Sequence, residues 1–167
     1  MRLFRREGTA ITAELSHQEA MVLAAFLAHL RGIVLGEGPR EVDGVDLLAR
    51  VFPKASRDDP AVAADFAAMT QEGLKQDKAA RLGRLADRLL SRQVALSFDE
   101  AREATQALAD ARLITAELCG VERVVSSWQD PDRPIESEQD FHLETYRILS
   151  AMQITLVDAL MGEDWAE

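Results

Sequence analysis

Apolar and polar positions near the N-terminus alternate with a period of two. From Thr9 to Leu15, β-branched and apolar residues recur at every second position, which is the pattern of a half-buried strand. Residues 3–7 precede Gly8, where the chain can turn back, so residues 1–15 are predicted to form an antiparallel β-hairpin. Residues 94–96 alternate in the same way. They are a candidate third strand, because an isolated hairpin is barely stable.

The rest of the chain is dominated by helical spacing of apolar residues. Ser16 with Glu19, and Ser97 with Glu100, have the spacing of a capping box, in which the Ser and Glu side chains satisfy free backbone N–H groups. Pro60 fits the first position of a further helix. The predicted principal helices cover residues 16–35, 60–92, 98–119 and 138–161.

Three expectations about helix faces are specific enough to be checked. In the first helix, Met21 is expected on the apolar face that also carries Leu23, Ala24, Leu27, Leu30 and Val34. In the second, the first half through Asp65-Phe66 is expected to anchor the core, with Ala64, Ala68, Leu82, Ala86 and Leu89 near one face. Its two glycines, Gly73 and Gly83, weaken this helix and are candidate positions for a bend. A further short helix is expected around residues 45–51.

These elements predict a mainly α protein. Residues 1–167 are expected to form a single domain, in which four helices pack as a bundle-like core and a small N-terminal sheet of two or three strands is added. Leu, Ala, Val and Ile must fill that core, because aromatic residues make up only 5% of the chain.

The charge is strongly asymmetric along the chain. The net charge is −10, and residues 93–167 hold 16 acidic against 5 basic residues, whereas residues 1–92 hold 13 against 14. An acidic surface repels nucleic acids and anionic membranes, so direct nucleic-acid binding is not expected. The apolar stretch Ala20–Leu35 contains His29 and Arg31 and falls short of the ~20 residues of a membrane span. A cytoplasmic protein without a membrane segment is therefore the prediction.

Residues suited to catalysis or metal binding do not form a recognisable motif. The chain has one cysteine, Cys119, which is interpreted as a small buried helix residue, with a reactive thiol as the alternative. The three histidines are far apart in the sequence and lack the spacing of a metal-ligand pair. No catalytic residue, metal or cofactor is predicted, and an enzyme is the less favoured interpretation.

Arginines recur on one side of the long second helix. Arg81, Arg84, Arg88 and Arg92 are spaced three, four and four residues apart, which places them along one side of a helix. One interpretation is a solvated face with local ion pairs, such as Asp77 with Arg81. The functional interpretation is a docking strip for an acidic protein partner, because few acidic residues lie nearby in the sequence.

Two charged residues interrupt the otherwise apolar, Ala-rich third helix. Asp110 and Arg112 are interpreted as structural, with Arg112 expected to pair with a carboxylate on a neighbouring helix, and Asp65 is the suggested partner. A deep cavity lined by Asp65, Asp110 or Arg112 would instead favour ligand binding.

Dispersed residues give the chain a resemblance to a known family. They are Arg50-Val-Phe-Pro53, Asp65-Phe66, Leu74, Lys78, the segment Leu108–Leu113, and Tyr146, Leu149, Gln153 and Leu156. With these residues the chain resembles the actinobacterial Domain of Unknown Function family two-thousand-and-seventeen. The resemblance implies a mostly helical cytoplasmic protein whose gene often lies near that of the Clp-protease adaptor ClpS. Asp65, Ala67 and Ala109 depart from the Glu, Arg and Asn that members tend to have there.

A non-enzymatic protein-interaction or regulatory module is the function that we predict. A transcription regulator acting through polymerase or a sigma factor is one alternative, and a small-molecule binder or enzyme with a site in the helical core is another. A protein partner is expected, and a homodimer is possible because the helices have broad apolar faces.

Overall fold

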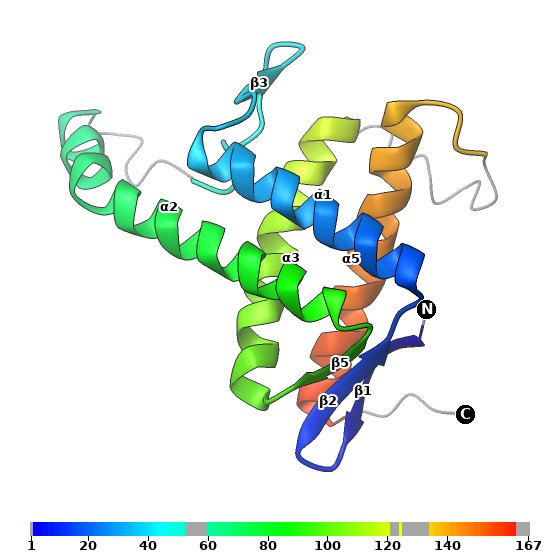
Figure 1. The fold of residues 1–167 in the computed structure, drawn as a ribbon. Helices are drawn as coiled ribbons and strands as arrows, with labels where there is room; N and C mark the ends of the chain where they lie inside the picture. The colour runs from blue at the N-terminus through cyan, green and yellow to red at the C-terminus, as the bar shows by residue number, and fades with distance from the viewer. Residues whose placement is uncertain (1, 53–59, 121–123, 125–133, 163–167) are drawn as a thin grey trace.

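The computed structural model describes residues 2–52, 60–120, 124 and 134–162. These residues form a mainly α structure with a small N-terminal sheet, as predicted. Two pairs of antiparallel helices make two layers that cross steeply (Figure 1). One layer holds α1 (His17–Leu35) and α2 (Pro60–Leu90), and the other holds α3 (Phe98–Cys119) and α5 (Glu138–Met161).

A three-stranded antiparallel sheet lies at one end of the molecule. Its strands are β1 (Arg2–Glu7), β2 (Ala10–Glu14) and β5 (Gln93–Leu96), in the order β1-β2-β5. The register places Ile11 opposite Leu96 and Ala13 opposite Val94, and all four side chains are buried. The expected third strand is therefore present, and it is the element that joins α2 to α3.

The predicted start signals of α1 and α3 are confirmed in atomic detail. The hydroxyl groups of Ser16 and Ser97 accept the backbone N–H of Glu19 and Glu100, and each glutamate accepts the N–H of its serine in return. The start of α5 was predicted without a cap, and Ser137 caps it by accepting the N–H of Asp140.

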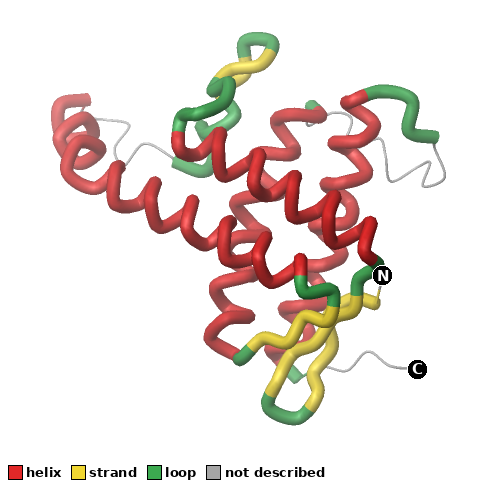
Figure 2. The backbone as a smooth tube through the Cα atoms, in the orientation of Figure 1, coloured by secondary structure: helices red, strands yellow, loops and turns green. Residues whose placement is uncertain are grey.

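Residues 45–51 do not form the expected helix. Residues 41–42 and 45–46 instead form a two-stranded hairpin, β3 (Glu41–Val42) with β4 (Val45–Asp46), followed by a turn. Asp43 and Gly44 both have positive φ, of 51° and 80°, as the tight Asp-Gly hairpin turn requires. Figure 2 shows this hairpin at the opposite end of the molecule from the larger sheet.

The helix α2 anchors the core with its C-terminal half, and the expectation that Ala64 and Asp65 of its first half contribute to the core is wrong. Ala79, Leu82, Leu85, Ala86 and Leu89 are buried, whereas Ala64, Asp65 and residues 70–74 are exposed. The side chains of Phe66 and Ala68 lie outside the described residues. The helix is also continuous from Pro60 to Leu90 through both glycines.

The helix α1 packs against α2, and its Leu23, Ala24, Leu27, Leu30 and Val34 are buried as expected. Met21 is 50% exposed and does not share this buried face. Among the described residues, α1 is the helix that is long and apolar enough to cross a membrane by length and composition alone. In the structure, however, 44% of its most apolar window is buried inside the protein.

Candidate protein-interaction groove between α2 and α3

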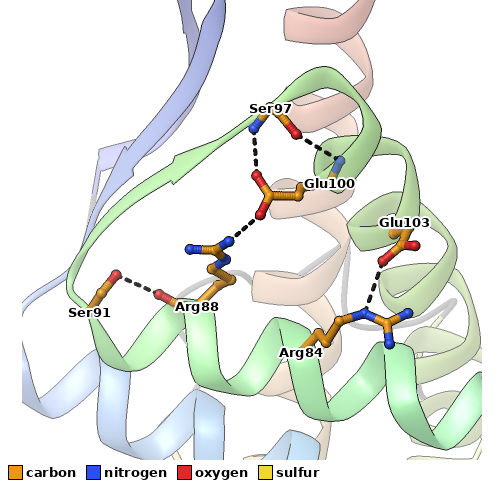
Figure 3. Close-up of polar contacts among 6 residues, drawn as sticks. All are labelled: Arg84, Arg88, Ser91, Ser97, Glu100 and Glu103. Atoms are coloured by element: carbon orange, nitrogen blue, oxygen red, sulfur yellow. Dashed lines mark hydrogen bonds and ion pairs between the residues drawn. The ribbon is translucent and has the colours of Figure 1, made fainter.

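The arginines of α2 reach across to the first turns of α3. The Nε of Arg84 lies 3.0 Å from a carboxylate oxygen of Glu103, and Arg88 pairs with Glu100 (Figure 3). The strand β5 is only four residues long, so the end of α2 and the start of α3 are held side by side. The expectation that few acidic residues lie near these arginines considered only their own helix. These ion pairs correct it.

Together these side chains border a groove of about 310 Å³. Arg81, Arg84 and Arg88 stand on the α2 side, with Asp87, and Glu100 and Glu103 stand on the α3 side. The apolar residues that line the groove are Leu85, Leu96 and Ala104. It therefore combines a basic wall, an acidic wall and apolar side chains.

Arg92 does not belong to this groove. The helix ends at Leu90, two residues earlier than predicted, and Arg92 has a left-handed φ of 64°. Its carbonyl accepts the backbone N–H of Leu15, which fixes the turn into β5. The structure thus brings together three of the four arginines that the sequence placed in one strip.

The electrostatics of the groove are those of a solvated surface. Arg84 and Glu103 are 56% and 52% exposed, so their ion pair is screened by water and contributes at most about 1 kcal/mol to stability. The pKa of Glu100 is lowered, first by the hydrogen bond from the backbone N–H of Ser97 and further by Arg88. Among the residues that the structure describes, no carboxylate forms an ion pair with Arg81.

Asp110 and Arg112 serve the packing of the helices, but with different partners from the one expected. Lys78 of α2 pairs with Asp110, with its Nζ 2.7 Å and 3.0 Å from the two carboxylate oxygens. Arg112 donates to the Oε1 of Gln153 at 2.5 Å and to the hydroxyl of Tyr146 at 3.2 Å, both on α5. Asp65 is exposed on α2, so the suggested pairing of Asp65 with Arg112 is wrong.

A second cavity, of about 350 Å³, lies where the end of α1, the β3–β4 hairpin region and α2 meet. Ile33, Leu48 and Phe52 supply apolar wall, and Arg40 and Lys75 supply positive charge. Neither cavity is lined by Asp65, Asp110 or Arg112, the residues whose presence in a cavity would have favoured ligand binding.

The cysteine and the histidines, all of which the structure describes, do not add a catalytic or metal site to the groove. Cys119 is buried, and its thiol donates to the carbonyl of Ala116. Within the described ranges, no three His, Cys, Asp or Glu side chains are placed to hold a metal ion.

Comparison with known families identifies the chain at the level of a family. The family model described as Domain of unknown function (DUF2017) matches residues 1–160. The chain belongs to this family. No curated protein and no solved structure matches it. The DUF2017 assignment agrees with the helical fold and leaves the function to be argued from the groove.

Proposed function

We propose that this DUF2017 protein is a non-enzymatic protein-interaction module of the cytoplasm, which binds an acidic segment of a partner in the groove between α2 and α3. The observation that supports this proposal is the row of arginine side chains along one wall of a groove whose floor is formed by Leu85, Leu96 and Ala104. A polymerase subunit or sigma factor with an acidic segment is one class of partner that this groove could bind.

The existing ion pairs of the groove do not preclude this role. Because Arg84 and Arg88 are about half exposed, breaking their pairs with Glu103 and Glu100 costs little. Partner carboxylates would exchange with these glutamates, and Arg81 offers a guanidinium group that no intramolecular carboxylate of the described part holds. Leu85 and Leu96 form the floor of the groove and are only 3% and 2% exposed, so a partner side chain placed against them would contribute most of the newly buried apolar area itself.

The partner would have to satisfy both walls. Its carboxylates would face α2, and its apolar side chain would lie between the walls. A basic or neutral flank would face Glu100 and Glu103, because like charges placed opposite one another suppress binding. An extended or helical peptide with acidic residues on one side meets these requirements.

Photo-crosslinking from inside the groove tests the proposal. A benzophenone amino acid replaces Asp87, which lines the groove, and a second variant carries it at the exposed Asp99 outside the lining. We expect a cytoplasmic adduct, identified by mass spectrometry, from position 87 and not from position 99. Adding Arg84→Glu and Arg88→Glu should reduce that adduct by at least about tenfold, which corresponds to 1.4 kcal/mol.

Two matched variants separate binding from folding. Arg5→Glu with Arg102→Glu makes the same change in charge at exposed positions away from the groove, and it should leave the adduct unchanged. Arg84→Glu with Glu103→Arg restores an intramolecular ion pair while moving the guanidinium to the other wall. It should melt like the native protein yet lose the adduct. If the adduct persists both in Arg84→Glu with Arg88→Glu and in Arg84→Glu with Glu103→Arg, the proposed site is refuted.

A further inference from the structure

An aromatic cluster joins α1 to α5 on a different part of the molecule from the groove. The ring of Phe26, on α1, lies 5.9 Å from that of Phe141 and 5.8 Å from that of His142, both on α5. His29 lies beside it, with its ring 6.4 Å from that of Phe26. Phe26 and His142 are 6% and 9% exposed, so an ionisable ring is packed among apolar ones.

This packing suits the neutral form of His142 and not the charged form. The Nδ1 atom is buried, and among the described residues it has no hydrogen-bond partner. A proton added to the ring would leave an N–H donor unsatisfied at that atom or a positive charge with little solvation. Both consequences weaken the contact of His142 with Phe26.

We infer that His142 is a proton-sensitive contact, whose protonation loosens α1 from the first turns of α5. The groups whose charges act on His142 come from both helices: Glu138 of α5 favours the protonated ring, and His29 of α1 opposes it. The third helix packed at this end, α3, contributes apolar Ala116 and Cys119, which cluster with Leu143.

The direction of the effect follows from the same burial. Desolvation lowers the pKa of His142 below its usual 6.5, and the neighbouring His29 lowers it further, while Glu138 acts in the opposite direction. The folded state therefore binds fewer protons than the unfolded state. The contribution of this contact is full above pH 6.5 and is lost as the pH falls through the lower pKa of the folded protein.

The experiment follows protonation and loosening in the same samples. The chain has three histidines, so NMR of the ring C–H groups between pH 8 and pH 5 can follow His142 once its signals are assigned by their loss in the His142 variants. Hydrogen exchange, corrected for its intrinsic pH dependence, is measured for residues 22–33 and 138–146. We expect His142 to titrate below pH 6.5 and exchange in both segments to accelerate, by at least about twofold, over that titration.

Three variants decide the outcome. His142→Phe keeps a packed ring that cannot be protonated, and His142→Gln provides a second neutral residue in case the phenyl ring does not fit. In both, the acceleration should disappear. His29→Gln should keep it and move it to higher pH, because a like charge is removed. Equal acceleration in the native protein and the His142 variants would overturn the inference, as would titration of His142 without any acceleration.

Discussion

At the scale of single residues, Lys78 and Asp110 form an ion pair that is largely shielded from water. Their side chains are 14% and 10% exposed, and the Lys78 ammonium also lies 5.8 Å from the centre of the Phe52 ring. In such surroundings an ion pair adds little over an apolar pair, because desolvation offsets the attraction between the charges. Removing one partner is different, since the other charge is then left in an apolar site.

We therefore predict a strong asymmetry between single and double substitutions at this pair. Asp110→Ala should lower the free energy of unfolding by about 3 kcal/mol, because Lys78 loses its only carboxylate among the described residues. Lys78→Met with Asp110→Leu should stay within about 1 kcal/mol of the native protein. Urea unfolding followed by circular dichroism measures both. Equal losses would show that the attraction itself, and not the cost of an unpaired charge, dominates.

At the scale of elements, the helix assignment of α2 continues through Gly73 and Gly83. Glycine weakens a helix mainly through the freedom that it retains in the unfolded chain, and this does not require a bend in the folded helix. A methyl group at Gly73 would meet no atom within 4 Å, and one at Gly83 would meet the side chain of Arg31 at 3.5 Å, an ordinary contact distance.

Both glycines should consequently be replaceable. Gly73→Ala and Gly83→Ala are each predicted to raise the free energy of unfolding, by up to about 1 kcal/mol. Gly73→Ala should also slow hydrogen exchange at residues 71–75, where the described side chains of α2 are largely exposed and local opening is the main route. A loss of stability in Gly83→Ala, measured by urea unfolding, would indicate that Arg31 cannot shift across α2.

At the scale of the whole molecule, the helices and the sheet followed from local signals, whereas the pairing of side chains did not. The capping boxes at Ser16 and Ser97 act within four residues, so their spacing predicts two helix starts correctly. The ion pair between Arg84 and Glu103 joins two helices, and it depends on how the short β5 places α3 beside α2. Sequence spacing along one helix contains no information about that neighbour.

The dependence on neighbouring elements also explains why the sequence did not show which half of α2 is buried. Ala64 is apolar enough for a core but is exposed, whereas the buried residues of α2 lie in its C-terminal half, where Arg31 of α1 lies beside Gly83. The Asp43-Gly44 turn was different, because its local signal was present in the sequence. The aromatic cluster around His142 joins residues more than a hundred positions apart, which no local pattern predicts.

The two helical layers share one continuous core, and this predicts how the molecule unfolds. Buried residues of α1, α2, α3 and α5, together with those of the three-stranded sheet, belong to one cluster. Leu82 of α2 is fully buried within it, whereas Glu103 is half exposed although it bridges α2 to α3. Leu82→Ala should therefore cost about 2–5 kcal/mol, through lost burial and a residual cavity.

Glu103→Gln should cost at most about 1 kcal/mol, because it removes a screened ion pair and leaves the core intact. In both variants, urea unfolding should remain a single transition, with coincident curves from circular dichroism and from the exchange of α1 and α5 amides. Separate transitions for the two layers in Leu82→Ala would show that the α1–α2 pair can melt while α3 and α5 remain folded. The shared core argues against that outcome, since neither layer can keep its buried face without the other.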